Sequence, residues 1–283
     1  MQVIRQAGQF ADALDAERLA GRAVGLVPTM GSLHDGHASL IRRAAAECDV
    51  VAVTVFVNPL QFGSGEDFDV YPRDLEADVD AAERAGATFV FAPTIEEMFP
   101  VERCTSVHVA GLGDVFEGAS RPGHFDGVAT VVAKLFILAG RSRAYFGEKD
   151  YQQLLVVRRM VSDLSFPVEV VRCPTVRDID GVALSSRNRN LDPEERAAAA
   201  VLYRALRAGA ASVLAGELDP TDVRSLVGAI VEAEPLVALD YAAVVGSATL
   251  VEPEKLSGEL RLLVAARVGG SRLVDNVGVK VPA

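Results

Sequence analysis

The sequence predicts an α/β fold, a Rossmann-like doubly wound parallel sheet with a second, smaller α+β domain at the C-terminus. Two observations lead to this prediction. In the first two-thirds of the 283 residues, apolar runs of strand length alternate with helix-like segments, which is typical of parallel strands buried on both faces. The last third changes to helices followed by alternating strands. Apolar residues make up 50% of the chain, which allows a sizeable core.

The first domain, residues 1–175, is predicted to hold the parallel sheet. Its clearest strand is the almost wholly apolar run VVAVTVFV at 50–57. Strands are predicted at 23–27, 50–57, 88–91, 144–146 and 168–172, and helices at 37–47, 75–85, 127–139 and 151–164. Such a sheet binds ligands beyond the carboxyl ends of its strands. The loops that follow strands are therefore the places to search for a site.

The second domain, residues 176–283, is predicted to open with a capped helix. Asp192 is suited to the N-cap, Pro193 to the first helical position, and Glu195 to completing a capping box. Helices are predicted from there to Leu214 and at 222–232, and strands at 239–245, 261–268 and 272–279.

Charge and composition exclude some functions. The net charge of −11 and pI of about 4.9 argue against nucleic acid as a partner, since phosphate backbones are held by clustered Lys and Arg. No secretory signal opens the chain, and no window approaches roughly 18 uncharged apolar residues, so no membrane partner is expected. The three scattered cysteines favour buried thiols in a reducing cytoplasm.

The loop after the first predicted strand, VPTMGSLHDGHASL at 27–40, is the most informative segment. Its helix N-terminus offers N–H groups and a positive dipole end to phosphate. Gly36 permits close approach of a nucleotide to the backbone. His34 and His37 can donate hydrogen bonds to phosphate oxygens where charge grows during displacement.

The HDGH string resembles the HxGH motif of nucleotidylyltransferases and class I aminoacyl-tRNA synthetases, which attack the α-phosphate of a nucleoside triphosphate. The longer string PTMGxLHxGHxxL resembles the pantothenate synthetase family at every fixed position. This resemblance covers residues 25–190 most strongly. It implies that ATP is bound by Met30, Gly31, Ser32, Leu33, His34, Asp35, Gly36 and His37.

Two further motifs follow the second predicted strand. The string FVNPxQFxxxEDxxxYPR, from Phe56 to Arg73, resembles the same family, in which the Gln binds pantoate and borders the β-alanine site. That role falls on Gln61, with Asn58 a weaker candidate for pantoate binding. The string RPGHF at 121–125 is placed at the site by the resemblance, but without a clear chemical role. It can also be read as a turn into the next helix.

Lys149, one of only four lysines, lies in the string FGEKDYQQ where a strand ends and a helix opens. An ammonium there can meet an α- or β-phosphate as a point charge. The resemblance implies that Gln153 binds pantoate and that ATP is contacted by Gly147, Glu148, Lys149 and Asp150.

The last motif, VRDIDGVALSSRN at 176–188, reads as a polar, cationic, flexible loop or as a linker between domains, and both readings can hold. Arg187 is suited to neutralising charge on departing pyrophosphate. The resemblance implies ATP binding through Val176, Leu184, Ser185, Ser186 and Arg187.

The resemblance implies a two-step ligation in which pantoate is activated as an adenylate and then joined to β-alanine, with release of pyrophosphate and AMP. His34, His37, Lys149, Ser185 and Arg187 are the implied catalytic residues. His37 acts either as proton donor or through hydrogen bonding alone. The second domain is expected to act as a lid, and a cytoplasmic homodimer is expected.

Mg²⁺ is expected to accompany ATP because it bridges triphosphate oxygens. Its protein ligands are unknown. Asp74, Asp78 and Asp80 are candidates, but a solvated helix face is the preferred reading of these three aspartates.

Three alternatives remain open. Another nucleotidylyltransferase, for example one acting on phosphopantetheine, shares the HxGH chemistry but keeps AMP in its product. A tRNA-charging enzyme conflicts with the short, acidic chain. A non-catalytic nucleotide-binding module conflicts with the placement of three of the four histidines and of Lys149 within motifs.

Overall fold

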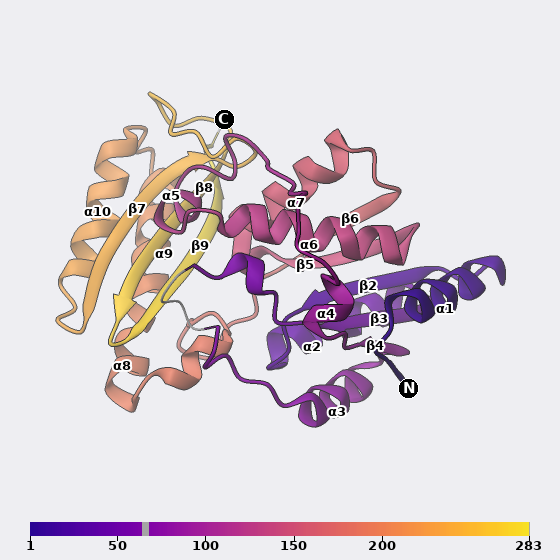
Figure 1. Ribbon diagram of the computed structural model, residues 1–283. Helices are drawn as coiled ribbons and strands as arrows, with labels where there is room; N and C mark the ends of the chain where they lie inside the picture. The colour runs from indigo at the N-terminus through magenta and orange to yellow at the C-terminus, as the bar shows by residue number, and fades with distance from the viewer. Residues whose placement is uncertain (64–67, 283) are drawn as a thin grey trace. The chain divides into compact units, whose positions relative to one another are not determined.

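The computed structural model describes residues 1–63 and 68–282, which form two compact units (Figure 1). The first unit comprises Met1–Glu148 and Gln152–Pro174, and the second comprises Lys149–Tyr151 and the chain from Thr175 onward. The division after Pro174 lies one residue from the predicted boundary at 175. The segment Lys149–Tyr151 differs from the prediction, because its contacts group it with the second unit.

The first unit is built on a six-stranded parallel sheet in the order β1-β4-β3-β2-β5-β6. The predicted doubly wound sheet is confirmed. Its strands are β1 Gln2–Ile4, β2 Val24–Thr29, β3 Val50–Val55, β4 Phe89–Phe91, β5 Ser142–Gly147 and β6 Val168–Cys173. Strand β2 lies between β3 and β5. The chain crossovers on either side of β2 therefore run in opposite directions from its carboxyl end, which is where doubly wound sheets bind ligands.

Helices cover both faces of this sheet. They are α1 Ala7–Leu19, α2 Asp35–Glu47, α3 Leu75–Ala85, α4 Ile95–Met98, α5 Glu117–Ser120, α6 His124–Ala139 and α7 Tyr151–Asp163, with 3₁₀ turns at Pro59–Gln61 and Glu148–Asp150. Helix α2 packs against α3, and α1 packs against α6. Right-handed crossovers place these two pairs on opposite faces of the sheet.

Two elements at the N-terminus were not predicted. Strand β1 has three residues at the sheet edge, and only Ile4 is buried. Helix α1 begins after Gln6, which makes no side-chain cap. A strand without alternation and a helix without a capping residue lack the local patterns that sequence reasoning uses.

The second unit packs helices against the three-stranded antiparallel sheet β7-β8-β9. Its elements are a 3₁₀ turn at Ser186–Asn190, α8 Pro193–Ala198, α9 Ala200–Leu214, α10 Pro220–Glu232, β7 Val237–Gly246, β8 Glu259–Val268 and β9 Ser271–Lys280. The predicted capping box is confirmed. Asp192 Oδ1 accepts from the main-chain N–H groups of Glu194 and Glu195 at 2.8 Å each, and Glu195 Oε2 accepts from that of Asp192 at 3.0 Å.

Among the described residues, one helical segment, Pro193–Leu214, is long and apolar enough to cross a membrane by length and composition. Half of its most apolar window is buried. Val201, Leu202, Leu206 and Val213 of this segment belong to the core of the second unit. The segment therefore matches the core helix of a folded domain.

The cysteines differ in burial. All three are free: Cys173 is buried, Cys48 is half-buried and Cys104 is exposed. The prediction of buried thiols is therefore wrong for Cys104, which lies in an exposed stretch of chain after α4.

Candidate active site

The HxGH loop leaves β2 and enters α2, with both histidines acting as helix caps. His34 is the N-cap residue, and its Nδ1 accepts from the main-chain N–H of Gly36 at 3.1 Å. His37 Nδ1 accepts from the main-chain N–H of His34 at 3.4 Å. The two ring centroids lie 4.1 Å apart.

These caps determine the tautomer of both imidazoles. A nitrogen that accepts a hydrogen bond is unprotonated, so the proton of each neutral ring is on Nε2. Nε2–H is the group that can donate to an oxyanion. The sequence therefore places two ring donors and the N–H groups of the first turn of α2 at one helix N-terminus, an arrangement suited to phosphate.

The turn before His34 is held by a buried carboxylate. Gly31 and Ser32 both have positive φ, +82° and +51°. The main-chain N–H groups of Ser32 and Leu33 donate to the Asp78 carboxylate at 3.0 and 2.7 Å. A Cβ at Gly31 would lie 2.6 Å from Asp78 Oδ2, so glycine is needed there for both space and conformation.

The burial of Asp78 contradicts the prediction that Asp74, Asp78 and Asp80 form a solvated helix face. Asp78 is only 4% exposed, so it does not belong to a solvated helix face. Asp74 caps α3 by accepting from the main-chain N–H of Ala77 at 3.1 Å. Asp80 is exposed, as that reading requires. Sequence reasoning therefore missed the supporting role of Asp78, which holds the HxGH loop from another helix.

Gln61, predicted to bind pantoate, is held by its neighbours. Its Oε1 accepts from Asn58 Nδ2 at 3.0 Å, and its Nε2 lies 3.1 Å from the sulfur of Met30. Asn58 is 1% exposed, and its Nδ2 also donates to the carbonyl of Gly127 at 3.1 Å. The structure gives Asn58 an orienting role toward Gln61, and its contact with pantoate stays a prediction.

The YPR part of the same motif has a structural role. Arg73 donates to the main-chain carbonyls of Phe68 and Tyr71 at 2.6 and 3.2 Å, and its guanidinium stacks 4.9 Å from the Phe68 ring centre. It lines a mostly apolar cavity of about 240 Å³ that Met30 and Asp78 also line. The motif positions Glu66 and Asp67 lie outside the described residues.

The two adjacent glutamines at the start of α7 have different environments. Gln152 is buried, and its Nε2 donates to the carbonyls of Leu112 and Val115 at 2.8 and 2.7 Å. Gln153, the predicted pantoate ligand, is half-buried. Gln152 therefore anchors a loop, and the pantoate role of Gln153 stays a prediction. Gly147 ends β5 and Glu148 opens the 3₁₀ turn, and both are half-buried.

Lys149 is tied to the second unit. Its main-chain carbonyl accepts from Asn276 Nδ2 at 2.8 Å, and its ammonium pairs with Asp150 at 3.0 Å. Asn276 is 4% exposed, and its Oδ1 accepts from Arg261 Nε at 2.7 Å. Sequence order places Lys149 with the parallel sheet, but these contacts with β8 and β9 hold its backbone.

The loop at Ser185–Arg187 includes a capped 3₁₀ turn, and its flexibility stays a prediction. Leu184 N–H donates to the carbonyl of Val176 at 3.0 Å, closing a narrow hairpin before it. Ser185 Oγ then caps the 3₁₀ turn, which contains Ser186, by accepting from the main-chain N–H of Arg187 at 3.3 Å.

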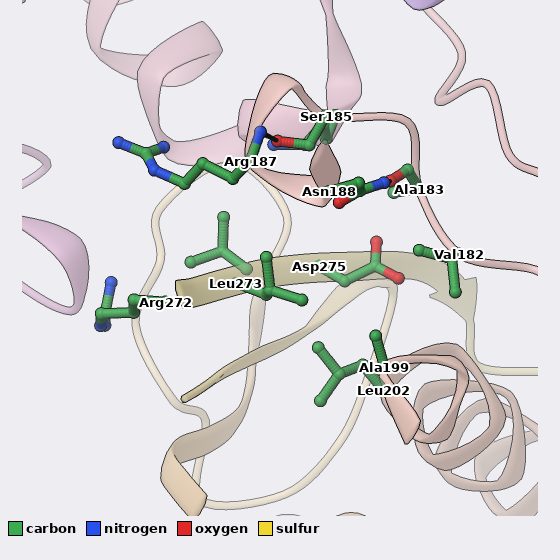
Figure 2. A pocket seen from close by; sticks show the side chains of 12 residues that line it. Val182, Ala183, Ser185, Arg187, Asn188, Ala199, Leu202, Arg272, Leu273 and Asp275 are labelled. Carbon is green, nitrogen blue, oxygen red and sulfur yellow. Dashed lines mark hydrogen bonds between the residues drawn. The ribbon is translucent and has the colours of Figure 1, made fainter. Parts of the chain in front are cut away.

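Lys149, Ser185 and Arg187 line one cavity of the second unit. Figure 2 shows Ser185 and Arg187 on one side of it, with Arg272 and Asp275 on the facing strand β9. At about 30 Å³ the cavity is too small for a triphosphate. The arrangement gathers cations and a hydroxyl in one place without a preformed nucleotide pocket.

Arg272 was missed by sequence reasoning. It lines the same cavity, and its Nε donates to Asp240 Oδ2 at 2.6 Å. It lies near the start of β9, just after the Gly269-Gly270 turn of a β-hairpin, a context that predicts a turn and does not indicate a ligand site. Its guanidinium adds a third cation beside Lys149 and Arg187.

The predicted ATP-binding residues are thus divided between the units. Those from Met30 to His37, with Gly147 and Glu148, belong to the first. Lys149, Asp150, Val176 and 184–187 belong to the second. The predicted pantoate ligands Asn58, Gln61 and Gln153 all lie in the first unit.

Comparison with known proteins agrees with this assembly of motifs. The family model described as Pantoate-beta-alanine ligase matches residues 2–278. A pantothenate synthetase of Moorella thermoacetica is 50% identical over 281 residues, covering 99% of each chain. One of Rubrobacter xylanophilus is 53% identical over 268 residues, covering 92% of each chain.

Solved structures agree as well. The crystal structure of pantothenate synthetase from Thermus thermophilus superposes with a TM-score of 0.94 at 50% identity, covering 99% of this chain and 100% of that one. The pantoate-beta-alanine ligase of Francisella tularensis, described as complexed with beta-gamma ATP and β-alanine, has a TM-score of 0.81 at 32% identity, covering 98% of this chain and 97% of that one.

Proposed function

The chain belongs to the pantoate-beta-alanine ligase family and is an enzyme that condenses pantoate with β-alanine to pantothenate, and from this premise we propose how its residues perform the reaction. ATP is the co-substrate. The pantoate carboxylate attacks the α-phosphorus and expels pyrophosphate, giving pantoyl adenylate. The amine of β-alanine then attacks the acyl carbon, and the C–O bond to AMP breaks.

The single observation that carries this mechanism is the double cap at the start of α2. His34 and His37 use their Nδ1 atoms to cap the helix, so each ring donates through Nε2–H. Donors fixed by the fold need no reorganisation when charge develops on the phosphate oxygens. We assign both histidines to the α-phosphate, with His37 acting as a neutral hydrogen-bond donor.

The cations of the second unit are assigned to the other phosphates. Lys149 and Arg187 neutralise charge that grows on departing pyrophosphate, and Ser185 donates through its hydroxyl. Arg272, which lines the same cavity, joins this set. Val176 and Leu184, joined by a main-chain hydrogen bond, contact the nucleotide through backbone groups.

Pantoate is assigned to the first unit. Gln61 and Gln153 offer carboxamides that both donate and accept, which suits a hydroxy acid. Asn58 orients Gln61, and Gln61 also borders the position from which β-alanine attacks.

Mg²⁺ would enter with ATP as part of the substrate and would neutralise charge on the triphosphate. Two of the described carboxylates near the sites already have partners. Asp78 accepts from the HxGH loop and Asp150 pairs with Lys149, which supports a metal held mainly by phosphate and water. A cytoplasmic homodimer is proposed on the family relationship, and sedimentation analysis tests the dimer.

Labelled pantoate tests the mechanism. With ¹⁸O in the pantoate carboxylate, attack on the α-phosphorus and later C–O cleavage transfer one labelled oxygen to AMP. Mass spectrometry of the products is expected to find that label in AMP and free pyrophosphate in equal amount. AMP without label would rule out the adenylate. AMP retained in the product would indicate adenylyl transfer instead of ligation.

A further inference from the structure

The RPGHF segment has contacts that reveal a role for two of its residues. Arg121 precedes α6, and His124 is the first residue of that helix. Both side chains reach one atom, the main-chain carbonyl oxygen of Gln61. His124 Nδ1 lies 2.8 Å from it, and Arg121 Nη2 lies 3.3 Å from it.

Arg121 also determines the protonation of His124. Arg121 Nη1 lies 3.2 Å from His124 Nε2. A guanidinium has only donors, so Nε2 of His124 accepts and carries no proton. The ring proton is therefore on Nδ1, where it is donated to the carbonyl of Gln61. This is the opposite tautomer to that of His34 and His37.

The backbone around Gln61 also lies close against α6. A Cβ on Gly127 would lie 2.2 Å from the carbonyl oxygen of Leu60 and 2.6 Å from the nitrogen of Gln61. Asn58 links the same helix to the Gln61 carboxamide through Nδ2. The main chain and the side chain of Gln61 are thus both held by residues at the start of α6. His124, the first residue of that helix, is 63 residues from Gln61 in the sequence.

We propose that Arg121 and His124 are positioning residues for pantoate recognition, acting through the Gln61 carbonyl that they share. This inference rests on the proposed role of Gln61 in binding pantoate. Neither residue is assigned a contact with substrate. Their effect is to hold the Gln61 backbone so that its carboxamide meets the hydroxy acid in one orientation.

Two substitutions of His124 separate positioning from general structure. Asn places an amide N–H near the Nδ1 position and keeps the donor, whereas Gln places it near Nε2 and loses the bond to Gln61. His124→Gln is expected to raise the KM for pantoate about tenfold, the scale of one lost hydrogen bond. The KM for ATP stays within about twofold of wild type on the same scale. His124→Asn recovers most of the pantoate affinity.

A matched control is His108→Gln. His108 is an exposed histidine outside any helix, and its Nδ1 hydrogen-bonds to Asp126 of α6 at 2.8 Å. It makes no contact with Gln61 among the described hydrogen bonds, and its substitution is expected to leave both KM values unchanged. If His124→Gln does not fold, as judged by its thermal unfolding midpoint, Arg121→Gln replaces it, because it removes the second contact to the same carbonyl.

Gln61→Ala distinguishes failure of this inference from failure of the proposed function. If Gln61→Ala leaves the KM for pantoate unchanged, the pantoate role of Gln61 is wrong. If it raises that KM, His124→Gln must have no further effect in the Gln61→Ala background. An equal rise in both backgrounds, or a rise in the ATP KM as large as in the pantoate KM, would overturn the positioning role.

Discussion

Replacing Asp78 by asparagine tests how the HxGH loop is held. The Asp78 carboxylate accepts from the main-chain N–H groups of Ser32 and Leu33, and it is buried. Asparagine has one carbonyl oxygen, so it can satisfy one of these donors. Its NH₂ group then faces the other N–H, which is left buried and unpaired.

The size of the effect follows from these two contacts. A hydrogen bond to a charged group contributes about 1.5–3 kcal/mol. Losing one of these hydrogen bonds is expected to shift His34 and His37 from their positions. If the whole of that free energy is lost from the transition state, the first-step rate falls about 10- to 100-fold, since each 1.4 kcal/mol is a factor of ten. The loop also carries the strained positive φ of Ser32, which the loss of one bond leaves less well held.

The assay is pantoate-dependent pyrophosphate release in a single turnover. Asp80→Asn is the matched control, because Asp80 lies on the same helix and is exposed. The control is expected to react at the wild-type rate. Equal rates for Asp78→Asn and Asp80→Asn would refute the argument that the buried carboxylate positions the loop.

Three other outcomes are expected. Lys149→Ala lowers the first-step rate about 10²–10³-fold, the scale of losing one transition-state donor, whereas the exposed Lys255→Ala leaves the rate unchanged. Asp192→Ala removes a capping box and lowers the unfolding free energy of the second unit by about 1 kcal/mol in urea titrations; an unchanged midpoint would contradict this. Arg196 holds the pKa of Asp180 below its usual value through a hydrogen bond. The stability that this ion pair contributes is therefore present above the pKa of Asp180 in the unfolded chain, and it is lost as pH falls through the pKa of Asp180 in the folded protein. In thermal melts at acid pH, Arg196→Ala is expected to make the unfolding midpoint fall less steeply as pH decreases. A midpoint that falls as steeply as in the wild type would contradict this.

The sheet could be predicted because its signal is local. Strand β3 is a run of buried apolar residues, and the helices after β2 and β5 begin at glycine-rich or charged turns. Strand β1 could not be predicted, because its place depends on pairing with β4 across 87 residues, as in Gln2 with Phe89, and not on its own pattern.

The site divides in the same way. The roles of His34 and His37 follow from a string of adjacent residues. The role of Asp78 depends on a contact across 46 residues, and that of Asn276 on one across 127. Helical periodicity made Asp78 look like part of a polar face, since the pattern does not show which carboxylate meets buried N–H groups. Long-range hydrogen bonds decide these roles, and one sequence does not display them.

The two-step ligation can be followed by mixing the protein with ATP, Mg²⁺ and pantoate and measuring pyrophosphate and AMP with and without β-alanine. We expect a pantoate-dependent burst of pyrophosphate without β-alanine, and continued release of AMP only when β-alanine is added. ATP consumption that responds to neither substrate would contradict the assignment of pantoate and β-alanine to this site.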